Sequence, residues 1–183
     1  MFRRGIRRAV IRGAARPNVP PLLRQAHELM ESGRYAEAAE AFEKLARGAE
    51  TRNHQKTPQF YLLAGRAHIK AGHKPAGFAF VKKGLGLLKN HPAQLFRMGN
   101  LSVTELDEVG MKAEALELTE WLKTALPATP AGTKMGAAAP VKKPVLPTRC
   151  PGCGGALRAG EVEWLDEVTA ECAWCGSAVR AEE

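Results

Sequence analysis

The chain has 183 residues, which is enough for one ordinary domain and a small additional module. With 45% hydrophobic and 25% charged residues, its composition is typical of a globular protein and excludes a fully disordered chain. A formal net charge of +8 favours an anionic partner such as a nucleic acid or a membrane surface. No stretch reaches the roughly 18 apolar residues that a membrane-spanning helix needs. The N-terminus lacks the apolar core of a signal peptide, so we expect a cytoplasmic protein.

The charge is distributed unevenly along the chain. Residues 1–18 contain six arginines and no acidic residue, whereas residues 150–183 contain two arginines and seven acidic residues. From Thr51 to Thr104 there are nine basic residues and again no acidic one. Only parts of the chain, chiefly the N-terminal arm and this central stretch, therefore have the charge to bind an anionic partner.

The N-terminal arm, residues 1–18, is a basic amphipathic segment. Phe2, Ile6 and Val10 recur every four residues among the arginines, which is typical of one face of a helix. Such a helix would suit an anionic membrane surface, contacted through residues 1–16, or a nucleic acid. The alternative is a solvated tail, because Gly5 and Gly13 weaken a helix.

Residues 19–126 predict an all-α domain of three helix pairs. Apolar residues at helical spacing occur in each of the ranges 22–49, 60–88 and 93–126. A turn glycine separates the two helices of each pair, and these glycines, Gly33, Gly72 and Gly110, lie 39 and 38 residues apart. A regular period of this size is typical of a solenoid of helix pairs.

Over residues 20–126 the sequence resembles the tetratricopeptide-repeat family, whose pattern has a small residue, a turn glycine, an alanine and an aromatic residue. The matching positions in the three pairs are Ala26, Gly33, Ala38 and Phe42; Gly65, Gly72, Gly77 and Val81; and Gly110, Ala115 and Pro127. The third pair departs from the family pattern at Val103, which stands at the small position, and at Thr119, which stands at the aromatic position. It fits the pattern better if its first helix is a turn longer, with Gly99 as the close-packing residue. The resemblance implies a right-handed solenoid of three helical hairpins, and another helical-hairpin repeat is the alternative.

The resemblance also implies a concave groove lined by the first helix of each pair. It directs six side chains toward the groove: Arg24, His27, Arg66, Lys70, Arg97 and Asn100. All of these except His27 are candidates for binding a carboxylate-rich segment of a protein partner. Lys82 and Lys83 are expected on the outer face. The alternative is a solvated basic face without a partner.

Residues 127–148 form a predicted linker. Five prolines punctuate residues 127–149, among alanine, glycine and threonine, and such a segment cannot bury enough apolar surface to fold. We expect few contacts to cross it, so that the helical domain would stay folded without residues 127–183.

Residues 149–183 contain all four cysteines of the chain, in two pairs that each have a two-residue gap: Cys150 and Cys153, then Cys172 and Cys175. A glycine follows each pair and lets the backbone turn its N–H groups toward the sulfur atoms. Apolar residues alternate around Asp166 and Glu167 and predict a short hairpin between the pairs. This spacing is typical of a zinc site.

The cysteine pattern resembles a zinc ribbon, although Ala173 rather than proline follows Cys172. The resemblance implies one structural zinc ion, Zn²⁺, bound by all four cysteines. So small a module cannot fold on its core alone, and zinc contributes about 10–16 kcal/mol in comparable modules. Four thiolates leave no open position for catalysis. The alternatives are iron in the same site, or disulfides in an oxidising compartment.

No pattern of catalytic residues stands out. The histidines lack ligand spacing, Gly84-Leu-Gly86 is not a phosphate loop, and an exposed hairpin face accounts for the carboxylates near Asp166. We therefore predict a non-enzymatic adaptor whose helical repeats bind an acidic segment of a protein partner, with the zinc ribbon as a second contact. The alternative is a nucleic-acid-binding or membrane-recruited protein that acts through the N-terminal arm and the central repeat. The acidic ribbon itself would repel phosphates.

Overall fold

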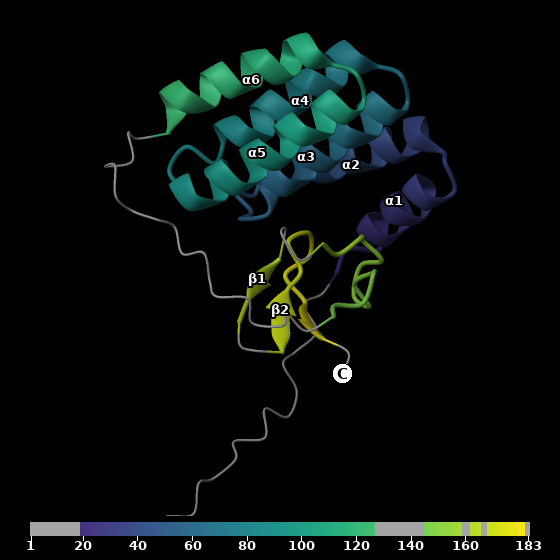
Figure 1. Ribbon diagram of the computed structural model, residues 1–183. Coiled ribbons are helices and arrows are strands. Elements are labelled where there is room, and N and C mark those ends of the chain that lie inside the picture. The colour runs from purple at the N-terminus through teal and green to yellow at the C-terminus, as the bar shows by residue number, and fades with distance from the viewer. Residues whose placement is uncertain (1–18, 127–144, 159–161, 166–167, 182–183) are drawn as a thin grey trace, which may run out of the picture.

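The computed structural model describes residues 19–126, 145–158, 162–165 and 168–181. The first of these ranges folds into three consecutive helix pairs that pack in sequence order, which confirms the predicted pairs (Figure 1). The pairs are α1 (Pro21–Glu31) with α2 (Tyr35–Glu50), α3 (Thr57–Lys70) with α4 (Lys74–Gly86), and α5 (Pro92–Glu108) with α6 (Lys112–Ala125). We call these six helices the helical array. Predictions for the N-terminal arm and for residues 127–144 of the linker lie outside the described residues.

The helices of the array begin and end where proline and glycine dictate. Proline occupies the first turn of α1, α3, α4 and α5, where its missing N–H costs no hydrogen bond. The first helix of each pair ends at a glycine in the left-handed region, with φ of +75° at Gly33, +88° at Gly72 and +76° at Gly110. The N–H group after each glycine donates to the carbonyl five residues earlier, at 2.8–2.9 Å. The three turns therefore share one geometry. None of the described helices has the length and apolar character of a membrane span.

Glycines also allow the helices of a pair to approach closely. A Cβ atom on Gly65 of α3 would lie 2.8 Å from the carbonyl oxygen of Gly77 of α4, and one on Gly77 would lie 2.7 Å from the carbonyl oxygen of Gly65. In the third pair, a Cβ atom on Gly99 would lie 2.5 Å from the side chain of Leu122. Because real Cβ atoms essentially never come this close to a backbone oxygen, the contact of Gly65 with Gly77 requires glycine, whereas a side chain at position 99 would require the end of the Leu122 side chain to shift. The predicted close-packing role of Gly99 is confirmed.

The C-terminal module, residues 145–181, contains a small antiparallel sheet. Its strands are β1 (Glu163–Trp164), β2 (Thr169–Glu171) and β3 (Ala178–Arg180), in the order β1-β2-β3. Trp164 pairs with Ala170, which in turn pairs with Val179, so these three residues share one face of the sheet. Ala170 and Val179 are buried. The predicted hairpin is confirmed as the β1–β2 pair.

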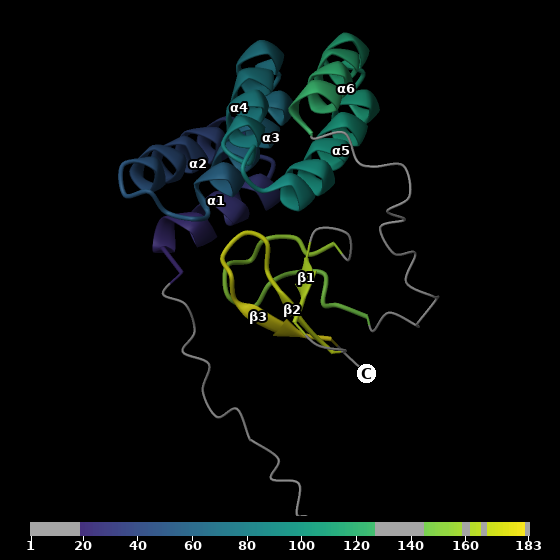
Figure 2. The ribbon, with the colours of Figure 1, turned by 90° about the vertical axis from the view of Figure 1, so that its left-hand side faces the viewer.

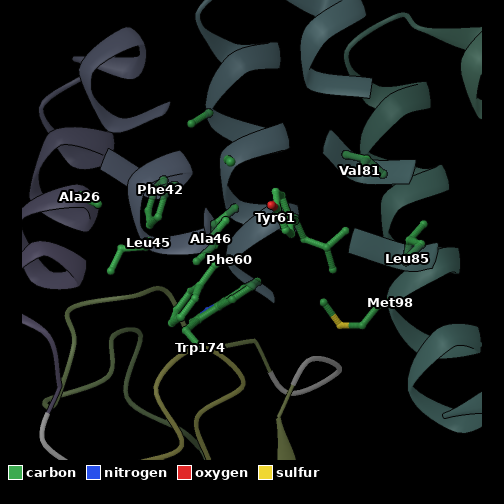
Figure 3. Close-up of a cluster of buried hydrophobic side chains, with 14 of the residues drawn as sticks. Ala26, Phe42, Leu45, Ala46, Phe60, Tyr61, Val81, Leu85, Met98 and Trp174 are labelled. Atoms are coloured by element: carbon green, nitrogen blue, oxygen red, sulfur yellow. The ribbon is translucent and has the colours of Figure 1, made fainter. Parts of the chain in front are cut away.

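One hydrophobic cluster runs through the array and continues into the C-terminal module. Phe42, Tyr61 and Leu85 are fully buried inside the array, and Figure 3 shows Trp174 of the module at the edge of this cluster. The module therefore shares the core of the array rather than forming a separate one.

Candidate metal centre and binding groove

Two short loops of the C-terminal module carry the four cysteines. Cys150 and Cys153 stand in the first loop, where the N–H of Gly152 donates to Cys150 Sγ at 3.3 Å and the N–H of Gly155 donates to Cys153 Sγ at 3.4 Å. Gly154, which directly follows Cys153, is in the left-handed region with φ of +76°. In the second loop Gly176 follows Cys175 with φ of +77°. The predicted role of these glycines in turning the backbone around the sulfur atoms agrees with this geometry.

The four sulfur atoms form a compact cluster. All of them lie within 4.8 Å of one another, with Cys150 Sγ 3.7 Å from Cys175 Sγ and Cys153 Sγ 3.9 Å from Cys172 Sγ. These distances are far too long for disulfide bonds, and the four cysteines are free. Three of the side chains are buried and Cys175 is half-buried. The cluster could hold one metal ion, and it is the one such group found among the described residues.

The thiols of this cluster ionise unequally. Hydrogen bonding with Cys150 raises the pKa of Cys153 and lowers the pKa of Cys175. Thiols packed so closely cannot all lose their protons without a compensating positive charge. A bound divalent cation would supply that charge, since metal ligation requires the thiolate form.

The module docks on the side of the array formed by α1, α3 and α5, away from α4 and α6 (Figures 1 and 2). Three basic side chains of the array, one near each helix pair, hold it there. Arg24 donates to the carbonyl of Gly152 at 2.8 Å, Lys56 pairs with Glu171 at 2.8 Å, and Arg97 donates to the carbonyl of Val162 at 3.4 Å. The structure therefore differs from our expectation of few contacts between the two parts.

The five predicted partner-binding residues have different surroundings. Arg24 and Arg97 are engaged by backbone carbonyls of the module. Arg66 is half-buried, lies 2.7 Å from Glu105 and has its guanidinium 4.9 Å from the ring centre of Trp174. The exposed Lys70 reaches the ring of Tyr35 at 5.5 Å, whereas Asn100 is exposed and lines none of the cavities described below.

The acid-free central stretch is partly neutralised by acidic residues from elsewhere in the chain. Within the described part of the chain, four of its nine basic side chains form ion pairs with glutamates outside it: Lys56 with Glu171 at 2.8 Å, Arg66 with Glu105 at 2.7 Å, Lys82 with Glu117 at 2.6 Å, and Lys83 with Glu50 at 3.0 Å. The charge segregation therefore joins the second helix pair to its neighbours and to the C-terminal module. These pairs also reduce the positive charge that remains for a phosphate backbone.

A cavity of about 270 Å³ remains between the array and the docked module. Its apolar lining includes Met30, Leu63, Ile69, Leu106 and Trp174. Its polar lining includes His27, Arg66, Lys70, Glu105 and Arg158. His27 is buried, which lowers its pKa to about 4, and its Nε2 atom has no hydrogen-bond partner among the described residues. A much smaller space of about 30 Å³ lies beside Gln59 and Arg97.

Sequence reasoning missed Trp174, Arg158 and Glu105 as residues of this site. Arg158 of the module lies 3.3 Å from Glu105, which also pairs with Arg66, so this carboxylate joins the two parts. One signal was available. A tryptophan between Cys172 and Cys175 is too large for the core of so small a module, which indicates that it is buried against something else.

Comparison of the chain with protein-family models, with curated proteins and with solved structures finds no match. The functional proposals below therefore depend on the residues and the geometry of this chain.

Proposed function

We propose that this protein is a non-enzymatic interaction protein that holds an acidic segment of a protein partner between its helical array and its C-terminal module. The single observation that carries this proposal is the cavity of about 270 Å³ on the α1, α3 and α5 side of the array. It combines an apolar lining with three basic side chains, from Arg66, Lys70 and Arg158. Concave, mostly apolar sites with a few polar groups are typical of binding pockets.

The array is, in this proposal, a right-handed tetratricopeptide-like solenoid. The support is the repetition of one turn geometry at Gly33, Gly72 and Gly110, together with the close contact of Gly65 and Gly77 at matching positions of the second pair. A solenoid of this kind has the first helix of each pair on its concave side. That arrangement agrees with the position of the cavity, which is lined mainly by residues of α1, α3 and α5.

The metal of the C-terminal module is, in this proposal, one structural zinc ion held by Cys150, Cys153, Cys172 and Cys175. Zn–S bonds of about 2.3 Å in a tetrahedron give S···S separations of about 3.8 Å. The separations of 3.7 Å and 3.9 Å agree with that value. A shell of four thiolates has no open position, which supports a structural rather than a catalytic role.

The test of partner binding uses a matched pair of charge reversals in the full chain. Lys70→Glu changes an exposed lysine that lines the cavity, and Lys44→Glu changes an exposed lysine of α2 outside it. The probe is a fluorescein-labelled ten-residue Gly/Ser peptide with the central sequence Asp-Leu-Asp, measured by fluorescence anisotropy. We expect Lys70→Glu to weaken binding about tenfold or more and Lys44→Glu to change it less than about twofold.

Two results would overturn the proposed function. The first is failure of the peptide to bind the wild-type chain at all. The second is an equal loss for Lys70→Glu and Lys44→Glu, accompanied by competition from single-stranded RNA, because a diffuse electrostatic surface would then be the binding site.

A further inference from the structure

The cavity between the array and the C-terminal module has walls from both parts. The array contributes side chains mainly from α1, α3 and α5, with Val81 from α4, whereas the module contributes Ala156, Arg158 and Trp174. Removal of the module would take away one wall of the pocket and leave an open helix surface. The pocket in its present shape therefore exists only while the module is folded and docked.

Trp174 is the part of the module that is most firmly fixed in this wall. Its side chain is 3% exposed and belongs to the same hydrophobic cluster as the core of the array. Its indole N–H donates to the carbonyl of Ala156 at 3.0 Å, and the guanidinium of Arg66 lies 4.9 Å from its ring centre. Trp174 stands between the two cysteines of the second metal-binding loop. Whatever orders that loop therefore also positions this wall of the pocket.

We propose that the C-terminal module is a permanent wall of the binding pocket, so that zinc and the partner segment each strengthen the binding of the other. This inference rests on the function proposed above. A segment that binds only the docked form must raise the affinity for zinc by the same factor by which zinc raises the affinity for the segment.

The lining of the pocket defines the chemistry of the segment. An apolar side chain fits between Leu63, Leu106 and Trp174. A neighbouring carboxylate fits the mouth, where the basic groups of Arg66, Lys70 and Arg158 outnumber the carboxylates of Glu105 and Glu108 by one. The Nε2 atom of His27, which is buried without a hydrogen-bond partner among the described residues, adds a polar contact in the same lining. The segment we infer has an acidic residue directly beside an apolar one.

The opposite arrangement is a module that blocks the groove and must leave before a partner binds. The contacts favour a module that stays docked and lines the pocket over a module that blocks it. Departure of the module would expose Trp174 to water, break the ion pair of Lys56 with Glu171, and leave Arg24 without the carbonyl of Gly152. A segment that binds beside the module avoids all of these losses.

The experiment measures anisotropy of the Asp-Leu-Asp peptide on the full chain with zinc, after removal of zinc by a chelator, and after zinc is added back. Asn-Leu-Asn and Asp-Ser-Asp peptides test the acidic and the apolar requirement. We expect removal of zinc to weaken binding about tenfold or more, with full recovery on addition of zinc. In the reciprocal measurement, competition with a chromophoric chelator should show zinc bound more tightly by the same factor when the peptide is present.

A matched pair of variants tests the wall without removing the metal. Arg158→Glu changes the module side of the pocket, and Arg180→Glu changes an exposed arginine on β3 outside it. We expect Arg158→Glu to weaken binding about tenfold and Arg180→Glu to change it less than about twofold, with one zinc per chain retained in both. Retained zinc and an unchanged tryptophan emission spectrum show that the module is still folded.

The outcomes separate the inference from the function on which it rests. If the peptide binds equally well with and without zinc, and Lys70→Glu weakens binding whereas Arg158→Glu does not, the proposed binding function stands. The inference that the module forms a wall of the pocket is then overturned. If the peptide binds more tightly after zinc is removed, the module blocks the groove and the inference is overturned. If the peptide binds no form of the chain, the proposed function fails and the inference fails with it.

Discussion

The helical array and the C-terminal module are stabilised in different ways. The array has six helices of 11 to 17 residues, a core of fully buried apolar side chains and glycine contacts that bring its helices together. The module has three strands of two or three residues, and three of its four cysteines are among its buried residues. We therefore expect the array to fold on the apolar residues of the chain, and we infer that so small a module needs a metal ion and the surface against which it docks.

The two parts meet through a mixed surface. Trp174 buries apolar surface, and two ion pairs, Lys56 with Glu171 and Arg158 with Glu105, join opposite charges across the surface. Apolar burial contributes most of the docking free energy in this view, and the partly exposed charges contribute specificity. The following changes test how each part is stabilised and what apolar burial and charge each contribute to docking, beginning with the largest expected effect.

Removal of the metal should unfold the C-terminal module and leave the helices of the array. The Cys172→Ser variant, treated with a chelator, should lose the folding free energy that zinc supplies, on the order of 10 kcal/mol in comparable modules. Far-ultraviolet circular dichroism should keep nearly all of its helical signal, while the tryptophan emission, to which Trp164 and Trp174 of the module contribute, shifts to the red. The control is the wild-type chain, in which zinc restores the emission. A parallel loss of the helical signal would show that the array depends on the module.

Truncation of Trp174 tests the apolar part of the docking surface. Trp174→Ala removes a side chain that is 3% exposed and should cost about 3–5 kcal/mol in urea-induced unfolding of the module. The matched control is Trp164→Ala, because Trp164 lies in β1 of the same module but is only half-buried. Its cost should be clearly smaller. Equal costs would indicate that the module is stabilised by its own sheet rather than by the array.

A glycine substitution tests whether the array depends on the close packing of its helices. Gly77→Ala adds a Cβ atom 2.7 Å from the carbonyl oxygen of Gly65, so α3 and α4 must move apart, at a cost of about 1–3 kcal/mol. Gly86→Ala in the same helix adds a Cβ atom with nothing within 4 Å, and it should be neutral or stabilising by up to about 1 kcal/mol. Thermal unfolding of both variants measures the difference. A neutral Gly77→Ala would contradict the tight contact between these helices.

The elements that the sequence predicts well are those encoded locally. Gly33, Gly72 and Gly110 mark the turns because only a few neighbouring residues decide whether a helix ends there. The spacing of the cysteines predicts the cluster because each pair lies within a single loop. These signals need no knowledge of distant residues.

The docking of the module could not be predicted in this way. The hydrogen bond from Arg24 to the carbonyl of Gly152 joins residues 128 positions apart, and a periodic sequence pattern cannot predict such a contact. For the acid-free central stretch, the sequence predicts an acidic segment of another protein as the partner. The structure instead pairs several of its basic side chains with glutamates of the chain itself, including Glu105 and Glu171. Charge segregation predicts that opposite charges meet, and it does not say whether they lie in one chain or two.

The smallest effect we predict is the coupling between Lys56 and Glu171. Their side chains are 22% and 36% exposed, so water screens much of their attraction, and a double-mutant cycle with alanine should give about 0.5–1 kcal/mol. The coupling should fall when the salt concentration is raised, because exposed charges are screened. The control cycle uses Lys123 and Glu120 of α6, which are 65% and 61% exposed and should couple more weakly. If the two cycles give the same coupling, this ion pair contributes nothing specific to docking, and the specificity must come from the apolar contact of Trp174 and from the other polar contacts, such as that of Arg24 with Gly152.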